Sequence, residues 1–314
     1  MRSFIHMQAS TIEEASRNAA KGNAMFIAGG TDLIGTLKDE CLPYYPAVVI
    51  DLKKIPGMDH IKEDGSDIVI GALVKLQDIA DSELVKTHCQ ALAEACGRAA
   101  SPTIRNMATL GGNICQMHRC WYFRTPDNRF VCARKGGKTC PAATGDNRYH
   151  SIYGIDQGCI AASPHDSAPA LVALGATIVT NTREVPAGEF FCANGCRSNV
   201  LEDGEIVKEV RIPKTAHSTF EKFALRKSID FPLVNCAVAE DASGEVHVVL
   251  GAVYPSPVRV EAAEAEIRGG ITEATAAAAG DAAVKDCMVL GKNEYKIEIA
   301  RTLVKRTLLK LAEQ

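Results

Sequence analysis

The stretch MFIAGGTDLIGTLK, residues 25–38, combines a short apolar strand, a pair of glycines and the first turns of a helix. Glycine has no Cβ atom, so Gly29 and Gly30 allow the backbone to approach a ligand closely. Thr31 and Asp32 are placed to cap the helix, whose first backbone N–H groups then favour a phosphate. The spacing matches neither GxGxxG nor a P-loop. The stretch predicts a phosphate-binding turn, with an ordinary strand-to-helix turn as the alternative.

A second pair of glycines lies in SPTIRNMATLGGNI, residues 101–114, where Gly111 and Gly112 stand between Thr109 and Asn113. Two glycine turns in one domain suggest a dinucleotide that is held from two sides. An ordinary loop with an asparagine turn is the alternative.

Helices and strands are mixed around these turns. Residues 11–20 predict a helix with Thr11 as its cap and Glu14 completing a capping box. Further along we expect a strand at 48–52, a hairpin at Asp64-Gly65, helices near 76–85 and 89–99, and a helix followed by a strand over 166–180. A second unit begins near residue 215, with two strands around the turn DASG (241–244) and three helical stretches. The last stretch, 297–311, has one apolar face that is typical of core packing: Ile299, Ala300, Leu303, Val304, Leu308 and Leu311.

The composition excludes several classes of protein. Hydrophobic residues make up 46% and charged residues 23% of the 314 residues, and the net charge is −3, as in an ordinary globular protein. Lys and Arg are scattered and aromatic residues are few, so we expect no nucleic-acid partner. The chain shows no stretch that would cross a membrane and no secretory signal. The cytoplasm is the expected compartment, although export bound to a partner that carries a signal stays open.

Three motifs in order, AGGTDL (28–33), TLGGNI (109–114) and SPHDSAPAL (163–171), resemble the FAD-binding medium subunit of molybdenum hydroxylases of the xanthine oxidase type. The resemblance covers essentially the whole chain. It implies an α+β fold with a PCMH-type, two-part FAD-binding domain over 1–214, followed by a carboxy-terminal antiparallel sheet with helices over 215–314.

The resemblance also implies a set of FAD contacts. Residues 27–33 would wrap the pyrophosphate, Asp166 would hold the adenosine side, and Ile206 would pack near the flavin ring. The full set is Ile27, Ala28, Gly29, Gly30, Thr31, Asp32, Leu33, Thr109, Leu110, Gly111, Gly112, Asn113, Asp166, Ile206 and Lys222. Arg105 would support either the phosphates or the fold.

Residues 115–161 interrupt the segment between the second and third motifs, and they carry five of the twelve cysteines. An insertion at this point places its contents beside the cofactor. Structural zinc sites favour close C-x2-C pairs, which are absent here. A plant-type 2Fe–2S site needs a cysteine at position 123, which is Phe123. A 4Fe–4S cluster needs only four thiolates that converge in space.

This insertion is most similar to that of bacterial aldehyde oxidoreductases, and 4-hydroxybenzoyl-CoA reductases also have one. The resemblance implies a 4Fe–4S cluster bound by Cys120, Cys132, Cys140 and Cys159, with Cys115 as a packing thiol. The basic side chains of Arg119, Arg134, Lys135 and Lys138 would either offset the charge of the cluster or form a solvated loop. We expect His118, His150 and His165 to be polar loop residues.

The function implied is that of an electron-transfer flavoprotein subunit with no catalytic residue of its own. Its partners would be a molybdopterin-binding large subunit, a 2Fe–2S small subunit and an external electron carrier. The substrate of the complex would be an aldehyde, an aromatic CoA thioester or an N-heterocycle. The alternatives are a self-contained flavin oxidoreductase on the same scaffold and a redox scaffold without catalysis.

Overall fold

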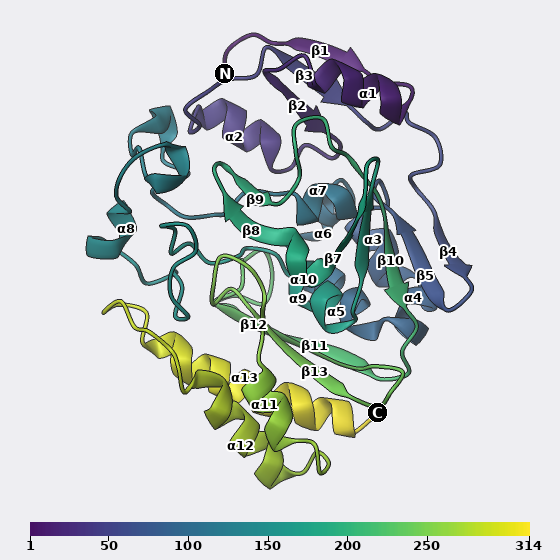
Figure 1. Cartoon of the computed structure of the whole chain (residues 1–314), viewed down its shortest axis with the longest axis vertical. Coiled ribbons are helices and arrows are strands. Elements are labelled where there is room, and N and C mark those ends of the chain that lie inside the picture. Colours follow the sequence, from purple (N-terminus) through teal and green to yellow (C-terminus); the bar gives the residue numbers. More distant parts are fainter.

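The computed structural model describes all residues, 1–314, and Figure 1 shows three layers of structure along the long axis of the molecule. At one end lies a three-stranded parallel sheet in the order β1-β3-β2. Its elements are β1 (Ile5–Gln8), α1 (Ile12–Ala19), β2 (Ala24–Ile27), α2 (Leu33–Asp39) and β3 (Val48–Asp51). The strand, the glycine pair and the helix expected over residues 25–38 are therefore present.

The second layer is a five-stranded antiparallel sheet in the order β4-β5-β10-β6-β7, with helices packed around it. Its strands are β4 (Ile61–Asp64), β5 (Asp67–Gly71), β6 (Thr177–Thr180), β7 (Glu184–Pro186) and β10 (Val207–Pro213). Its helices are α3 (Leu76–Asp81), α4 (Glu83–His88), α5 (Gln90–Arg98), α6 (Pro102–Arg105), α7 (Leu110–Ile114), α9 (Ser167–Ala173) and α10 (Ala187–Phe190).

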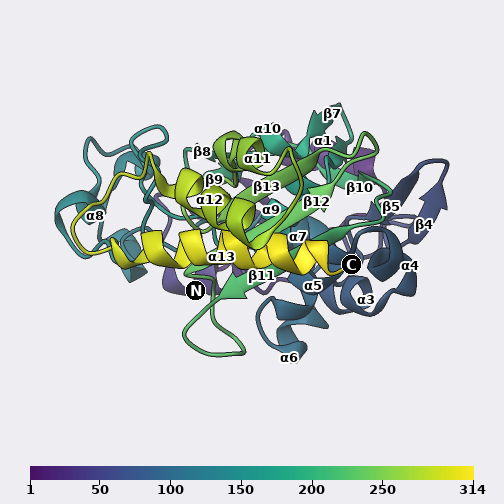
Figure 2. The same cartoon turned by 90° about the horizontal axis from the view of Figure 1, so that it is seen from below.

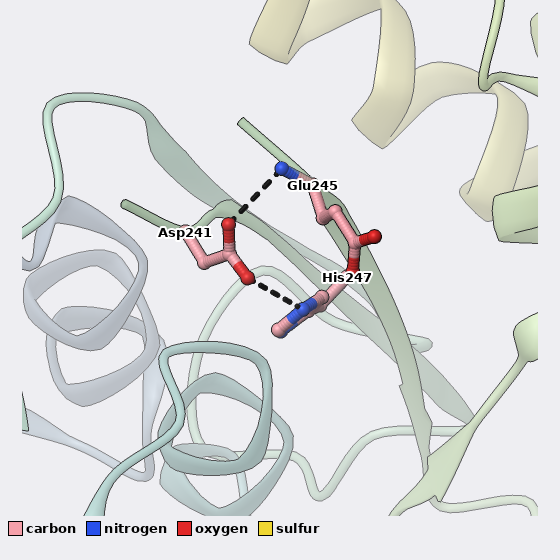
Figure 3. Close-up of side chains that lie close together, drawn as sticks. All are labelled: Asp241, Glu245 and His247. Atoms are coloured by element: carbon pink, nitrogen blue, oxygen red, sulfur yellow. Dashed lines mark hydrogen bonds and ion pairs between the residues drawn. The ribbon is translucent and has the colours of Figure 1, made fainter. Parts of the chain in front are cut away.

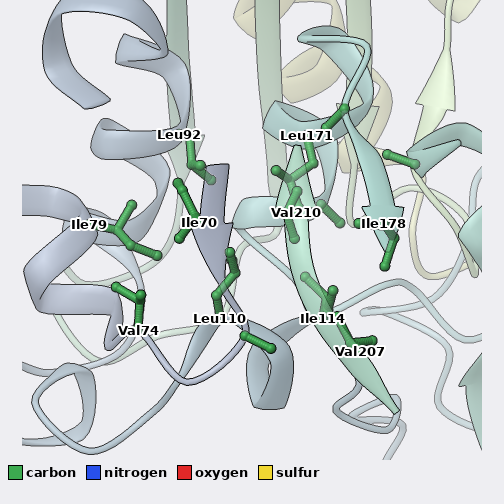
Figure 4. Packing of buried hydrophobic residues seen from close by; sticks show 14 of the residues in the cluster. Ile70, Val74, Ile79, Leu92, Leu110, Ile114, Leu171, Ile178, Val207 and Val210 are labelled. Atoms are coloured by element: carbon green, nitrogen blue, oxygen red, sulfur yellow. The ribbon is translucent and has the colours of Figure 1, made fainter. Parts of the chain in front are cut away.

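The main hydrophobic core lies where α7 packs beneath β5 and β10. Figure 4 shows Leu110 and Ile114 of α7 close to Ile70 and Val210 on the two strands. All four side chains are fully buried. This packing fixes the position of the second glycine segment relative to the sheet.

The third layer is the antiparallel carboxy-terminal sheet β11-β12-β13-β14, which α11 and α13 cover, while α12 packs against these two helices. Helix α13 runs across β11 and β12, as Figure 2 shows, while α5 and α9 pack on these strands from the second layer. The elements are β11 (Ser218–Phe223), β12 (Val234–Glu240), β13 (Val246–Gly251), β14 (Val258–Arg259), α11 (Glu261–Glu266), α12 (Glu273–Val284) and α13 (Tyr295–Ala312). The α+β class and the order of its parts are confirmed.

Residues 115–161 have little regular structure, as their composition predicts. They contain η1 (Pro126–Asn128), η2 (Ala133–Lys135) and α8 (Pro141–Thr144), and they lie at one side of the molecule near the start of α13 (Figures 1 and 2). A short hairpin, β8 (Phe191–Asn194) and β9 (Arg197–Asn199), lies beside them. No helix of the chain has the length and apolar character needed to cross a membrane.

Local details differ from the expectations in three places. The helix expected at 76–85 is split at Ser82, whose hydroxyl accepts from Val85 N–H and begins a new helix. Thr11 caps α1 as expected, but the carboxylate of Glu14 accepts from the backbone N–H of Ser10. The segment TLGGNI forms a short helix in place of a turn.

Candidate functional site

A cavity of about 950 Å³ is lined by residues from both amino-terminal sheets. The two glycine segments, far apart in the sequence, share its wall. The expected cofactor residues that line it are Ile27, Ala28, Gly29, Gly30, Thr31, Asp32, Leu33, Thr109, Gly111, Gly112, Asn113, Asp166 and Ile206. Leu110 and Lys222 are not part of its lining.

The turn between β2 and α2 carries free hydrogen-bond donors. None of the backbone N–H groups of residues 28–33 donates a hydrogen bond within the chain. Gly30 has a φ of 72°, which side chains other than glycine rarely adopt. A Cβ atom on Gly29 would lie 2.0 Å from the carbonyl oxygen of Met107, so Gly29 lets the two glycine segments touch. The free donors suit the oxygens of a pyrophosphate.

The carboxylate of Asp32 makes no capping bond to α2, which corrects the expectation for this residue. Its Oδ1 accepts from the guanidinium groups of Arg119 and Arg124, both at 2.8 Å, and its Oδ2 accepts from the N–H of Met117 at 3.1 Å. Arg124 also donates to Thr36 Oγ1 on α2 at 2.6 Å. All three donors to the Asp32 carboxylate belong to residues 115–161. The inserted segment is therefore hydrogen-bonded directly to the first glycine turn.

Helix α7 presents one face to the cavity and buries the other. Thr109 caps it by accepting from Gly112 N–H at 3.2 Å, and Asn113 Oδ1 accepts from the hydroxyl of Ser167 at 2.6 Å. Leu110 points into the core (Figure 4). Leu110 therefore anchors the segment, while its neighbours face the cavity.

Asp166 lies at the cavity wall, and Lys222, which is not part of the lining, balances the charge of its carboxylate. The Lys222 ammonium donates to Asp166 Oδ2 at 2.7 Å, and Asn235 Nδ2 donates to Oδ1 at 3.0 Å. Burial raises the pKa of Asp166, and the ion pair with Lys222 opposes this rise. Lys222 thus acts on the cavity through Asp166. Arg105 donates to Gln77 and to the carbonyl of Ala99, which supports the fold.

The β8–β9 hairpin and residues 201–207 form a third wall of the cavity. Of the residues in this wall, the sequence predicted only Ile206 as a cofactor contact. Glu205 holds this wall in place, because its carboxylate accepts from Arg183, Thr180, Thr182 and the N–H of Glu202. Burial alone would raise the pKa of Glu205, but these hydrogen bonds outweigh it and lower the pKa to about 2. The motif DGEI (203–206) is the sequence signal that marks this wall.

The four expected cluster cysteines, Cys120, Cys132, Cys140 and Cys159, line one small cavity inside the inserted segment. Cys115 lies elsewhere, against the main core, and burial raises its pKa to about 12. No three of the cysteine sulfurs lie within 4.8 Å of one another. The sulfurs thus surround a common space but are not gathered as the ligands of a single ion would be.

Asp241, Glu245 and His247 form the one set of three possible ligands whose atoms lie within 4.8 Å (Figure 3). The carboxylate of Asp241 accepts from the N–H of Ser243 at 2.8 Å and of Glu245 at 3.0 Å, and it pairs with His247. These contacts stabilise the turn between β12 and β13. The set therefore has a structural role.

His118, His150 and His165 lie outside helices and strands, as expected, but all three are buried. His118 and His165 are fully buried and contact backbone carbonyls of Pro255 and Gln116. His150 places Nε2 3.2 Å from Cys120 Sγ. Burial lowers the pKa of His150 to about 4, so its ring is neutral near pH 7.

The carboxy-terminal domain holds the second half of the inserted segment. Asn147 donates to the carbonyl of Leu290 and accepts from the N–H of Lys292. The ammonium of Lys296, on α13, donates to the carbonyl of His150 at 3.0 Å. Lys296 is 1% exposed, and burial lowers its pKa to about 7. Its role was missed because the sequence predicted a helix only over 297–311, whereas α13 begins at Tyr295 and so includes Lys296.

Comparison with known proteins agrees with this geometry. A family described as FAD binding domain in molybdopterin dehydrogenase matches residues 2–215, and one described as CO dehydrogenase flavoprotein C-terminal domain matches residues 218–311. The chain is 32% identical to the aldehyde oxidoreductase FAD-binding subunit PaoB of Escherichia coli, over 96% of both chains. It is 29% identical to the carbon monoxide dehydrogenase medium chain of Hydrogenophaga pseudoflava, over 91% of this chain and 88% of that one.

Solved structures have the same fold. The structure of carbon monoxide dehydrogenase from Hydrogenophaga pseudoflava that lacks the Mo-pyranopterin moiety aligns with a TM-score of 0.77 at 27% identity, over 99% of this chain and 98% of that one. Quinoline 2-oxidoreductase from Pseudomonas putida 86 aligns with a TM-score of 0.75 at 22% identity, over the same shares, and supports the fold alone. The chain belongs to the FAD-binding medium subunits of the molybdenum hydroxylases, the family of xanthine oxidase and CO dehydrogenase.

Proposed function

We propose that this chain passes electrons between the molybdopterin and 2Fe–2S subunits of a hydroxylase complex and an external carrier, with FAD and a 4Fe–4S cluster as its own cofactors. The observation that carries the proposal is the cavity that both glycine segments line. The free backbone N–H groups of residues 28–33 lie at this cavity and suit the oxygens of a pyrophosphate. FAD exchanges one or two electrons and an iron–sulfur cluster exchanges one, while the protein supplies position and electrostatics.

The FAD would be held from three sides. The backbone N–H groups of residues 28–33 donate to the pyrophosphate, and Thr109, Gly112 and Asn113 approach it from α7. Asp166 accepts from the adenosine side, with Lys222 balancing its charge at 2.7 Å. Ile206 would pack near the flavin ring at the third wall of the cavity, which Glu205 stabilises.

The 4Fe–4S cluster would be bound by Cys120, Cys132, Cys140 and Cys159. The support is that their side chains line one cavity, with sulfurs too widely spaced for a single ion. A cluster bound by four thiolates is an anion, and the surrounding segment 115–161 has seven basic and three acidic residues in a chain of net charge −3. Zinc is the competing occupant, and it would give a colourless site.

We also propose the division into an FAD-binding domain at 1–214, with the inserted iron–sulfur loop at 115–161, and a carboxy-terminal flavoprotein domain at 215–314. Support comes from the two family matches, which meet between residues 215 and 218. Lys222 and Lys296 both reach from the second domain to the first, so the domains would act as one unit.

The substrate of the complex would be an aldehyde, an aromatic CoA thioester or an N-heterocycle. An aldehyde is favoured by the 32% identity to a subunit named for aldehyde oxidation. The substrate would bind to the large subunit, because this chain's candidate sites hold cofactors.

Anaerobic purification of the chain with its neighbouring partners tests the proposal. We expect a molybdopterin-binding subunit to co-purify, and one FAD per chain to pass into the supernatant after acid precipitation. The isolated chain should contain about four iron atoms and four sulfides, the content of one 4Fe–4S cluster. Purification of an active flavoprotein without partners would favour the self-contained oxidoreductase. Absence of flavin would favour the redox scaffold.

A further inference from the structure

The four basic side chains around the expected cluster have different environments. Arg119 is paired with Asp32 at 2.8 Å, and Lys138 is exposed. Arg134 is buried, but it donates to the carbonyl oxygens of Gly195 and Arg197. Only Lys135 is both buried and without a partner, since it is 6% exposed and its Nζ atom makes no hydrogen bond.

An unpartnered ammonium inside a protein is costly, because it loses its hydration and gains nothing in return. The Lys135 Nζ atom lies 5.1 Å from the centre of the Phe123 ring, a contact that replaces only part of that hydration. The position therefore calls for a nearby anion, and no carboxylate of the chain forms an ion pair with Lys135.

The surroundings of Lys135 point to Cys132 as the source of this anion. One turn of 3-10 helix begins after Cys132, and the N–H of Lys135 donates back to its carbonyl oxygen at 2.8 Å. Phe123 packs against Cys132, Cys41 and Cys196 in one apolar cluster. Cys41 and Cys196 donate their S–H protons to the carbonyl oxygens of Thr36 and Arg134, and so behave as neutral thiols. The sulfur of Cys132 makes no such bond, and Cys132 is one of the residues that line the cluster cavity, whereas Lys135 is not.

We propose that Lys135 is a positioning residue whose buried ammonium pairs with the iron–sulfur site through the Cys132 thiolate and raises the reduction potential of the cluster. This inference rests on the proposed 4Fe–4S site. A reduced cluster carries one more negative charge than an oxidised one, and a fixed cation beside it favours the reduced state. Exposed Lys138 has little such effect, because water screens it.

The test compares Lys135→Met, Lys135→Arg and Lys138→Met in the purified holo-complex. The measurements are iron and acid-labile sulfide content, FAD content, and the midpoint potential of the 4Fe–4S signal in an electron paramagnetic resonance titration. We expect Lys135→Met to keep its FAD and to have a lower midpoint potential than the wild type. Lys135→Arg and Lys138→Met should stay near the wild-type potential.

Two results would overturn the inference: an unchanged potential in Lys135→Met, or an equal fall in Lys138→Met. Loss of iron from Lys135→Met alone would support it, because the anionic cluster then depends on this charge. Loss of iron from Lys135→Arg as well would contradict it, since the charge is kept. A wild-type complex that shows no 4Fe–4S signal and only the iron of its 2Fe–2S subunit would refute the proposed cluster itself, a result distinct from an unchanged potential in a variant that keeps the 4Fe–4S signal.

Discussion

Replacement of Gly29 by alanine tests how the two glycine segments build the FAD cavity. An ideal Cβ atom at this position lies 2.0 Å from the carbonyl oxygen of Met107 and 2.7 Å from its carbon. Both are backbone atoms, which cannot rotate away as a side chain can. An ordinary contact begins at 3.4 Å, so the segment 101–114 must shift by about 1.4 Å to restore one.

Overpacking of this kind typically costs about 1–3 kcal/mol. Because the displaced segment forms the opposite wall of the cavity, most of this cost should appear as weaker FAD binding. A loss of about 2 kcal/mol corresponds to a roughly 30-fold higher Kd. Gly30→Ala should cost less, about 1–2 kcal/mol, since the main penalty there is the positive φ of 72°.

Gly35→Ala is the matched control, because it lies on α2 just after the turn and an added Cβ atom there meets nothing within 4 Å. It should leave FAD binding unchanged and stabilise the helix slightly. The assay is equilibrium titration of FAD into the deflavinated complex, followed by flavin fluorescence. Wild-type affinity in Gly29→Ala, or an equal loss in Gly35→Ala, would refute the reasoning.

Three further predictions concern the cluster, the link between the sites and the pH dependence. Cys140→Ser should lower the iron and sulfide content of the purified complex, whereas Cys115→Ser should leave it near normal; the reverse pattern would rule out the ligand set. Arg124→Met removes the bonds to Asp32 and Thr36, so it should increase both the release of FAD and the loss of iron to a chelator; loss of only one cofactor would show that the contact does not join the two sites. The low pKa of Glu205 stabilises the fold fully above the unfolded-state pKa of about 4.5, and this contribution is lost as the pH falls through about 2. Glu205→Gln should therefore lower the free energy of unfolding near pH 7 by about 2 kcal/mol, the scale of a hydrogen bond to a charged group, and should weaken the dependence of the Tm on pH below 4.5. An unaltered Tm profile would contradict this assignment.

Local patterns were enough to predict the strand, glycine pair and helix at residues 25–38 and the amphipathic helix α13. The order of the three motifs was enough to predict the family. These signals are readable because short-range backbone preferences and the spacing of apolar residues act within a few positions.

The contacts that join distant segments were not readable in the same way. Asp32 was expected to cap α2, yet its partners lie 85 to 92 residues further along the chain. Lys296 lies just before the helical stretch expected at 297–311, and nothing in the sequence showed that it would be buried against a carbonyl 146 residues away. The sequence also did not show which of the basic residues near Cys132 would be buried. Their burial depends on the packing of Phe123 and the β8–β9 hairpin against them.

The contact between Lys296 and His150 has a consequence for the timing of biosynthesis. A ribosome adds about 5–20 residues per second, so roughly 7–30 s pass between the synthesis of the inserted cysteines and that of the lysine that fixes their loop. During this interval the loop lacks its anchor on the carboxy-terminal domain, and the thiols are open to oxidation or to the wrong metal. For the proposed cluster we therefore expect iron and sulfide to be delivered after translation, when α13 has docked and the four cysteines line one cavity.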